Sequence, residues 1–536
     1  MSNPIRMRRY CFAILPFTLL VSSSAFATLR YVNVANPNPA APYTDWTTAA
    51  NVIQDAVDTS QAGDTLIVTD GLYKLGGRAI YGIITNRVAI DKPITVQSVN
   101  GPSVTFIEGN SAPGDFAIRC VYMTNGASLI GFTLRNGATR ATGIAQEFTG
   151  GGVYCESTAA TISDCIFTAN YGYWGGAAGF GSLWNCTITN NSGVWGGGTY
   201  ASVLNNCLVI SNSASDVGGG LYTTLGTNCT VVGNYAYSGG GGAYGGIVNW
   251  STIIYNKSQY GGGGGDTIFN NCLVASNVAN ISGGGSAGGL GTVSRNTIFR
   301  GNFGGYCGGV LQGEIYNCVV AQNRGGTGPG GTRDATAFNS IVYANTGPIP
   351  SDNFTNDPGF VNMSAGNFHL RPDSPCINAG QSGAAPAGPD LDNHPRIVGG
   401  AVDLGPYEFQ TPTSLISYTW LAQYGLPNDG SADFADTDGD GMNNYREWLS
   451  RTDPTDPNSV FKLNVVKTNL PGTTISWLSR SYEPYYVQRT TNILAPDTFQ
   501  TIKTNIVNPK GATVYFTDTN RLSFGSYFYR VGLAHY

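Results

Sequence analysis

The sequence predicts an all-β protein whose main body is a single-stranded right-handed parallel β-helix, a coil of short strands stacked turn upon turn. Three observations support this fold class. A short motif recurs at intervals of 21 or 22 residues, glycine accounts for 74 of 536 residues, and charged residues make up only 11%. Globular proteins average about 7% glycine and about 25% charged residues, so this composition does not fit a helical bundle or a charged disordered chain.

The recurring motif places Asn five positions after Cys, Ser or Thr, and glycine clusters such as Gly196–Gly198 and Gly218–Gly220 follow. Its length fits one solenoid turn of three short strands joined by tight bends. Glycine and asparagine favour such bends because they tolerate positive φ. Ten copies are in register: Gly131–Asn136, Cys165–Asn170, Cys186–Asn191, Cys207–Asn212, Cys229–Asn234, Ser251–Asn256, Cys272–Asn277, Thr297–Asn302, Cys318–Asn323 and Ser340–Asn345.

Stacked turns convert equal positions into columns of side chains. The Asn column predicts a ladder of amides that hydrogen-bond from turn to turn. The Cys column predicts an interior row of free thiols, because stacked side chains point the same way whereas a disulfide needs converging Cβ vectors. A disulfide between adjacent turns is the alternative.

Both ends of such a rod expose strand edges and core, so each needs a cover. At the N-terminal end, the apolar residues of Trp46–Asp58 recur at helical spacing and predict a cap helix before the strand Asp64–Thr69. At the C-terminal end, residues 353–409 lose the glycine clusters and are predicted to close the stack. The β-helix domain with its caps is therefore expected over residues 28–410.

Residues 1–27 have the order of a secretory signal peptide: arginines at the start, an apolar stretch from Cys11 to Val21, and Ala25-Phe26-Ala27 as the cleavage site. No transmembrane segment is predicted, because each apolar stretch is shorter than the roughly 20 residues that a spanning helix needs. An exported protein is expected. The net charge of −5 offers no basic patch, so nucleic acid is not an expected partner.

Residues 411–459 form an acidic linker that contains a metal-binding motif. The sequence from Asp436 to Glu447 matches D-x-D-x-D-G-x₅-E, a spacing that sets oxygens around one Ca²⁺ ion while Gly441 makes a sharp bend. Helices are predicted over Leu415–Tyr424 and Asn444–Leu449, and bound Ca²⁺ would stiffen the junction between domains. The alternative is a solvated acidic linker. The predicted ligands are Asp436, Asp438, Asp440, the Met442 carbonyl, Asn444 and Glu447.

Residues 460–536 alternate apolar and polar side chains in the manner of β-strands, with turn residues between them. They predict a small β-sandwich of fibronectin-like character. The predicted strands are Thr474–Trp477, Tyr485–Arg489, Ala512–Asp518 and Tyr527–Leu533.

Aromatic residues flank the glycine clusters. Aligned aromatic faces along a rod can stack on the C–H faces of sugar rings, so they predict an extended glycan as ligand. The alternative is that the rings only stack on one another. The candidate carbohydrate-binding residues, which precede the clusters, are Trp174, Trp195, Tyr237, Tyr260 and Tyr306; a second set, Tyr154, Tyr200, Tyr222 and Tyr244, follows them.

Catalytic groups are scarce in the repeats. Residues 150–345 contain six acidic and five basic residues and no histidine, which excludes histidine-dependent triads and histidine metal sites there. Glu314 and Asp334 precede the Cys/Ser positions of adjacent turns and could share a face, so they are the candidate catalytic carboxylates. The alternative is scattered surface charge.

Several motifs resemble known families. The GG-x-Tyr runs at Gly151–Tyr154, Gly219–Tyr222 and Gly241–Tyr244 resemble the repeats of polymorphic outer-membrane proteins and other pectin-lyase-like β-helix surface proteins. Asn367–Gly380 and Asp390–Phe409 are similar to the terminal segment of the choice-of-anchor Q group of secreted proteins. The calcium motif resembles loops of dockerin-like and thrombospondin type 3-like linkers.

These resemblances imply a secreted or cell-surface location, and they are compatible with carbohydrate-active enzymes and with adhesins. The expected function is binding of extracellular polysaccharide, with Ca²⁺ as cofactor. Two alternatives stay open: a polysaccharide lyase or glycoside hydrolase acting on an acidic polysaccharide, and a purely structural surface protein.

Overall fold

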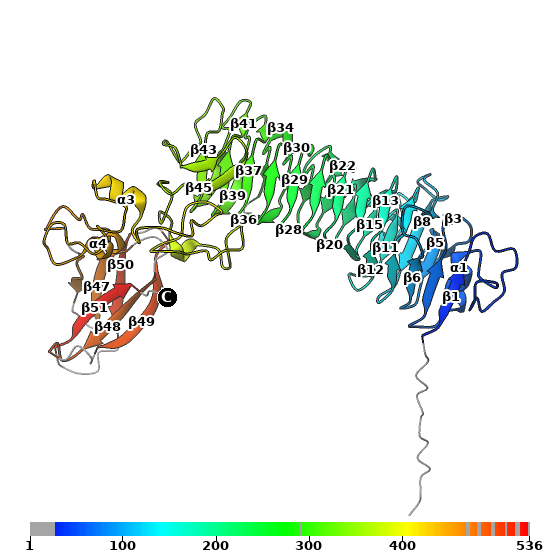
Figure 1. Ribbon diagram of the computed structural model, residues 1–536, viewed down its shortest axis with the longest axis horizontal. Coiled ribbons are helices and arrows are strands. Elements are labelled where there is room, and N and C mark those ends of the chain that lie inside the picture. Colours follow the sequence, from blue (N-terminus) through cyan, green and yellow to red (C-terminus); the bar gives the residue numbers. More distant parts are fainter. Residues whose placement is uncertain are drawn as a thin grey trace, which may run out of the picture.

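The protein is an elongated rod with a smaller domain at its C-terminal end, as seen in the computed structural model (Figure 1). The structure describes residues 27–289, 291–459, 461–467, 472–479, 484–494, 499–509, 512–519 and 526–533. The predicted signal peptide, apart from its last residue, lies outside the described residues.

The rod is a parallel β-helix, which confirms the predicted fold class. Its first face is a sheet of 12 parallel strands, one from each turn. In chain order these are β3 (Gly71–Tyr73), β7 (Thr105–Glu108), β10 (Thr133–Arg135), β13 (Ile166–Thr168), β17 (Thr187–Thr189), β21 (Leu208–Ile210), β25 (Thr230–Val232), β29 (Thr252–Ile254), β33 (Leu273–Ala275), β37 (Ile298–Arg300), β40 (Val319–Ala321) and β43 (Ile341–Tyr343).

The second face is a sheet of eight shorter strands that begins later in the chain. The strands are β14 (Tyr171–Trp174), β18 (Ser192–Trp195), β22 (Ser213–Val217), β26 (Tyr235–Ala236), β30 (Lys257–Tyr260), β34 (Val278–Ser282), β38 (Phe303–Gly304) and β41 (Arg324–Gly325).

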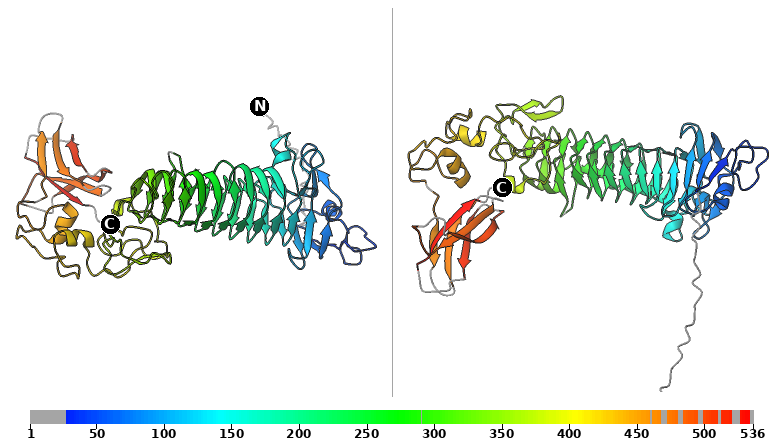
Figure 2. Two further views of the ribbon diagram at one scale, coloured as in Figure 1. Left: turned by 90° about the horizontal axis from the view of Figure 1, so that it is seen from above. Right: turned by 60° about the horizontal axis from the view of Figure 1, so that its bottom comes forward.

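The third face is a bent sheet of 23 strands, because most turns contribute two short strands separated by a corner. One row contains β4 (Arg78–Ala79), β5 (Thr85–Ile90), β8 (Ile118–Met123), β11 (Val153–Cys155), β15 (Ala178–Gly179), β19 (Thr199–Tyr200), β23 (Leu221–Tyr222), β27 (Ala243–Tyr244), β31 (Gly264–Gly265) and β35 (Ser286–Ala287). The other contains β1 (Leu29–Val32), β2 (Thr65–Val68), β6 (Thr95–Ser98), β9 (Ser128–Ile130), β12 (Thr161–Ser163), β16 (Ser182–Trp184), β20 (Val203–Asn205), β24 (Leu225–Thr227), β28 (Ile247–Asn249), β32 (Ile268–Asn270) and β36 (Val293–Arg295). The last strands, β39 (Val310–Tyr316) and β42 (Thr332–Phe338), run through both rows. Figure 2 shows the regular stacking of the turns.

The predicted Asn ladder is present in the rod. The backbone N–H and the side-chain amide of Asn212 both donate to Oδ1 of Asn234 in the next turn, at 2.9 and 3.0 Å, and the amide also donates to the Ile188 carbonyl of the preceding turn. The same pattern runs from Asn170 to Asn345. Each ladder amide therefore ties together three consecutive turns.

One of the ten predicted copies is out of register. Thr133 of β10 pairs with Ile166 of β13, so Gly137 aligns with the ladder residue Asn170, and Asn136 precedes the ladder position. Asn136 instead occupies a corner with a φ of 55°. The ladder consequently begins at Asn170.

The glycine clusters have two physical causes. The first glycine of a cluster makes a bend with positive φ, as expected: Gly218 has a φ of 70°. The next two have no room for a side chain, because a Cβ on Gly219 would lie 2.4 Å from the Tyr235 carbonyl oxygen and one on Gly220 would lie 3.1 Å from the Asn234 side chain. The chain thus crosses tightly over the ladder amide before it enters the third face.

The Cys column forms an interior row of free thiols, as predicted. Cys186, Cys207 and Cys229 stand immediately before strand residues that pair directly, Thr187 with Leu208 and Leu208 with Thr230. All three are at most 3% exposed. Burial raises the pKa of Cys165 and of Cys318 to about 12, which keeps both thiols protonated and unreactive at neutral pH.

The N-terminal cap helix is present but shorter than predicted. Helix α1 covers only Ile53–Thr59 and buries Ile53, Ala56 and Val57 in the rod core. The preceding residues 45–48 form a turn instead, and Ala50 exchanges backbone hydrogen bonds of 2.9 and 2.7 Å with Tyr31 and Asn33 at the edge of β1. Both the helix and this segment cover the first turns.

The C-terminal segment closes the stack with only a few residues, contrary to the prediction for residues 353–409. Asn353 supplies the missing next turn: its side chain accepts the Val342 N–H at 2.7 Å and donates to the Ser340 carbonyl at 2.9 Å. The chain then folds back along the outside of the first face, where Ile298, Val319 and Ile341 become buried. This segment contains β44 (Phe360–Asn362), β45 (Asn367–Leu370) and the 3₁₀ helix η1 (Ser382–Ala384).

A buried cluster of charged residues, the clasp, fastens this segment to the rod. The clasp comprises Asp390, Arg396, Asp403 and Glu408, each at most 6% exposed. Arg396 donates at 2.7 Å to Asn296 of the rod, and the carboxylates accept backbone N–H groups of the segment itself. Burial raises the pKa of Asp403 to about 7; burial and the charge of Asp403 raise that of Glu408 to about 9.

The linker and the terminal domain follow. Helix α3 (Tyr418–Gln423) begins three residues later than predicted, and α4 (Asn444–Ser450) matches its prediction to within one residue. The sandwich contains the predicted strands as β47 (Thr473–Leu478), β48 (Pro484–Thr490), β50 (Thr513–Asp518) and β51 (Phe528–Leu533), together with β46 (Asn464–Lys467) and β49 (Gln500–Val507), which the sequence did not predict. Its two antiparallel sheets enclose Ile475, Trp477, Tyr485 and Val487.

Across the described ranges, no helix has both the length and the apolar character needed to cross a membrane.

The ladder predicts a specific loss of stability. Asn234→Ala should lower the free energy of unfolding by about 2 to 4 kcal/mol, because it removes the acceptor of the buried Asn212 N–H and side-chain amide, together with the amide that donates to the Val209 carbonyl. Denaturant unfolding measures the change. Asn205→Ala is the matched control, because the Asn205 side chain lies at an outward position of β20 and forms no hydrogen bond with the residues that the structure describes. Equal losses in the two variants would contradict the role of the ladder.

The clasp predicts a pH dependence. A carboxyl whose pKa is raised in the folded state binds its proton more tightly there than in the unfolded chain. The stability that this proton contributes is therefore fully present below the unfolded pKa of roughly 4. It is lost as the pH rises through the folded pKa, about 7 for Asp403 and about 9 for Glu408. Hydrogen-exchange protection of the Val398 and Phe409 amides, corrected for intrinsic rates, should therefore fall between these limits. The Asn234 amide, which donates to a non-titrating side chain, is the control. Constant protection at Val398 and Phe409 would refute the prediction.

Candidate functional site

The aromatic residues after the glycine clusters form a stacked column. Tyr200 stacks on Tyr222 and Tyr222 on Tyr244, with ring centroids 5.6 and 5.9 Å apart. Where Gly179 interrupts the column, Phe180 bridges Tyr154 and Tyr200 by edge-to-face contacts. For these residues, mutual stacking accounts for the sequence pattern.

The aromatic residues before the glycine clusters are only partly in register. Trp174 pairs with Trp195, and the column continues through Val217 and Gly239 to Tyr260. Tyr237 and Tyr306 fall outside it, contrary to the expectation that all five candidates align. The reason is a β-bulge in β22 and another in β34, each of which inserts one extra residue and shifts the register.

Trp174 and Trp195 are half-buried and pack into the stack. Their rings are 5.7 Å apart and nearly parallel, and Trp195 also stacks on Tyr222. The bulge in β22 places Asp216 so that it accepts the Trp195 indole N–H at 2.9 Å. The buried indole nitrogen of Trp174 has no such partner. Both tryptophans are therefore part of the aromatic stack.

Two adjoining grooves lie where the second and third faces meet. The first, of about 250 Å³, is lined by Tyr244, Tyr260 and Asp266. The second, of about 510 Å³, is lined by Tyr260, Tyr306 and Ile281, the last of which belongs to the bulge in β34. Tyr260 is 48% exposed and contributes to both grooves. The grooves therefore form one aromatic surface, called here the groove face.

Charged groups lie at the two ends of the groove face. Asp266 borders the first groove; burial, together with the charge of Asp266 and its hydrogen bond, raises the pKa of Tyr244. At the other end the guanidinium of Arg333 lies 3.8 Å from the ring centroid of Tyr306, a cation–π contact. The sequence did not single out Asp216, Asp266 or Arg333 for this surface. The extra residues of the bulged turns are the signal that could have located Asp216.

The two candidate catalytic carboxylates have separate partners. Glu314 accepts the Tyr316 hydroxyl at 2.9 Å and pairs in register with Thr336. Asp334 lies two positions earlier in the adjacent strand, at a corner with a φ of 53°, and is 3.8 Å from the Arg333 guanidinium. No hydrogen bond or ion pair joins Glu314 to Asp334, both of which the structure describes. Only Asp334, through Arg333, borders the groove face.

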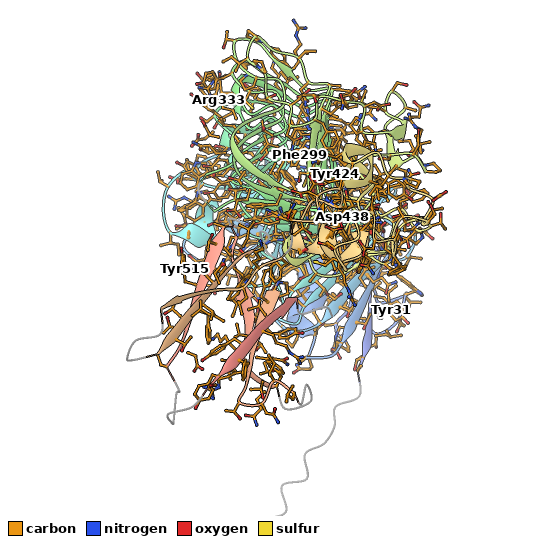
Figure 3. The ribbon with its side chains drawn as sticks, turned by 90° about the vertical axis from the view of Figure 1, so that its left-hand side faces the viewer. Tyr31, Phe299, Arg333, Tyr424, Asp438 and Tyr515 are labelled. Carbon is orange, nitrogen blue, oxygen red and sulfur yellow. The ribbon has the colours of Figure 1, made fainter. Side chains whose placement is uncertain are left out.

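The predicted calcium loop brings its first three ligands together. Oxygens of Asp436, Asp438 and Asp440 lie within 4.8 Å of one another. Gly441 makes the expected bend with a φ of 96°, and Asp436 accepts the N–H groups of Gly439 and Gly441. Figure 3 views this end of the molecule and labels Asp438. The motif therefore folds into a carboxylate cluster.

The oxygens available in this loop fit a cation. One oxygen each of Asp438, Asp440 and Glu447 is buried and accepts no hydrogen bond. Burial, followed by the charges of Asp438, Asp440 and Asp436, raises the pKa of Glu447 to about 7. A divalent cation would be coordinated by these oxygens and would offset the repulsion between the carboxylates, as expected for hard oxygen ligands.

The side chain of Asn444 forms two hydrogen bonds within the linker. Its side-chain amide donates to the Ala432 carbonyl at 2.8 Å and accepts the Thr437 hydroxyl at 2.9 Å. Asn444 thereby ties the start of α4 to the preceding chain, while the Met442 N–H is bound by Asp440. The side chains that would hold Ca²⁺ are Asp436, Asp438, Asp440 and Glu447.

No protein-family model matches the sequence, and no curated protein matches it. Among solved structures, the chain is similar to pectate lyase Pel9A, with 13% identity, a TM-score of 0.35, and coverage of 72% of this chain and 97% of the lyase. It is also similar to a rhamnogalacturonan lyase, with 12% identity, a TM-score of 0.31, and coverage of 64% and 95%. For the PL6 family alginate lyase AlyGC the identity is 13% and the TM-score 0.25, with coverage of 54% of this chain and 39% of the lyase. A functional proposal therefore rests on the residues of this chain.

The loop predicts calcium binding through its carboxylates. Asp438→Asn and Glu447→Gln should each weaken Ca²⁺ binding at least roughly tenfold in isothermal titration calorimetry, because each removes charge from a buried oxygen ligand. Ca²⁺ should also raise the unfolding temperature of the wild type.

Asp429→Asn is the matched control, because Asp429 lies in the same linker but binds Ser431 and not the loop. Wild-type affinity in both loop variants, or no heat of binding in the wild type, would show that the cluster is not a calcium site.

Proposed function

We propose that the protein binds an extended polysaccharide along the groove face, outside the cell or at its surface. The observation that carries this proposal is Tyr260, an exposed ring shared by two adjoining grooves whose other walls include Tyr244 and Tyr306. Sugar rings pack on such faces through their C–H groups, and nearby polar groups bind the hydroxyls. An open groove along a rod suits a chain more than a small molecule.

The surrounding architecture supports binding. The groove face lies on a rod held by buried ladders, so its rings are positioned before a ligand arrives, which lowers the entropic cost of binding. Tyr222 stacks on the groove residue Tyr244, Trp195 stacks on Tyr222, and Asp216 fixes the Trp195 indole. In this proposal the calcium loop stiffens the connection between the rod and the sandwich.

Cleavage of an acidic polysaccharide is the second candidate. It is favoured by Arg333, which stacks on Tyr306 at the end of the second groove and lies 3.8 Å from Asp334. An arginine and a carboxylate beside a groove are groups that a lyase or hydrolase can use. Release of unsaturated or reducing ends from a uronate polymer, abolished in Arg333→Gln, would select cleavage over simple binding.

Binding is tested by removing one ring at a time. Tyr260→Ala and Tyr306→Ala should each weaken retention on a panel of neutral and acidic polysaccharides by roughly two- to tenfold, the loss expected for one stacking contact. Affinity electrophoresis measures the retention.

Tyr255→Ala is the matched control, because Tyr255 is 65% exposed but lines neither groove. Retention lowered equally in all three variants, or unchanged in Tyr260→Ala and Tyr306→Ala, would contradict binding at the groove face.

A further inference from the structure

A third cleft lies between the linker and the sandwich, away from the groove face. It has a volume of about 650 Å³ and is lined by Arg446 and Leu449 of α4, by Phe461, by Tyr486 of β48 and by Arg530 of β51. Figure 1 shows α4 beside the strands of the sandwich. The cleft combines aromatic walls with two guanidinium groups.

Tyr486 forms a fixed platform in this cleft. It lies directly opposite Gly532 in the paired strands β48 and β51. A Cβ on Gly532 would lie 2.4 Å from the phenol ring, so the ring packs flat over the backbone of β51. Glycine at this position therefore keeps the aromatic platform close to the sheet.

Arg530 is held in place beside the platform. Its Nε donates to Gln488 at 2.5 Å, and its guanidinium lies 4.3 Å from the ring centroid of Phe499. Gln488 is fixed in turn by Thr501, to which it donates at 2.8 Å. These contacts orient the guanidinium of Arg530, which lines the cleft.

Neither Arg446 nor Arg530 forms an ion pair within the described part of the chain, and both are exposed. Two uncompensated guanidinium groups beside an aromatic platform suit a ligand that carries carboxylates on a ring with an apolar face. A uronic acid has both features, because its C–H face stacks on an aromatic ring while its carboxylate accepts hydrogen bonds from arginine.

We propose that the cleft between α4 and the sandwich is a second binding site, which takes a carboxylated saccharide through Arg446, Arg530 and Tyr486. This site is independent of the groove face. It assigns a binding role to the terminal domain.

The calcium loop is coupled to this site by position. Arg446 immediately precedes Glu447 on α4. The cluster of Asp436, Asp438 and Asp440 lies in the loop that leads into this helix. Without a cation these carboxylates oppose the approach of an anionic ligand, whereas a divalent cation cancels part of their charge. The cleft should therefore bind uronates more tightly in the presence of Ca²⁺.

The test uses trigalacturonate and the full chain in the Tyr260→Ala background, which weakens the groove face. Calorimetry in Ca²⁺ buffer should show binding that falls at least roughly tenfold in Arg446→Gln and in Arg530→Gln, as expected when a charge-assisted hydrogen bond is lost. The methyl ester of the same trisaccharide should bind weakly, and chelation of Ca²⁺ should lower the affinity for the acid.

Arg451→Gln is the matched control, because Arg451 follows the same helix but does not line the cleft. Unchanged affinity in both Arg446→Gln and Arg530→Gln, equal affinity for acid and ester, or no binding in the parent would overturn the proposal. Affinity that chelation leaves unchanged would overturn the coupling to calcium. Circular dichroism of each variant checks that the sandwich is folded.

Discussion

The hydrogen bond from each ladder asparagine to Oδ1 of the next one is the interaction on which the rod depends. It is buried, it repeats in every regular turn, and it fixes the vertical register of the chain. The glycine clusters follow from it, because the chain must cross the ladder amide where no Cβ fits. Register in turn aligns rings that lie far apart in the sequence. The aromatic groove face is thus a consequence of a buried polar column.

The rod was predictable because its constraint is periodic. Asn, Cys and Gly recur at fixed spacing, so a single turn determines most of the others. The caps were less predictable, since they depend on contacts formed after the rod exists: Ala50 adds to the edge of β1, and residues after Asn353 fold back over Val319. In the sandwich, the largely exposed strand β49 lacks a clear apolar alternation and was not predicted.

The candidate sites show the same division. The carboxylate cluster of the linker was predictable because its residues lie within one short motif, whereas the hydrogen bond from Asn444 to the Ala432 carbonyl depends on how the preceding chain folds. The aromatic candidates were only half predictable, since β-bulges in β22 and β34 displace Tyr237 and Tyr306 from the column. The bulge in β34 places Ile281 at the groove face, and the bulge in β22 places Asp216 against the Trp195 indole. Irregular turns within a regular rod therefore contribute side chains that the repeat alone does not specify.

The central claim is that the ladder-determined register creates the glycan-binding groove face. A crystal structure of the protein with a bound neutral oligosaccharide tests it most directly. Sugar rings packed on Tyr260, with the asparagine amides of the underlying turns bonded in sequence, are the predicted result. Sugars bound on another face of the rod, with Tyr260 uncovered, would contradict the account.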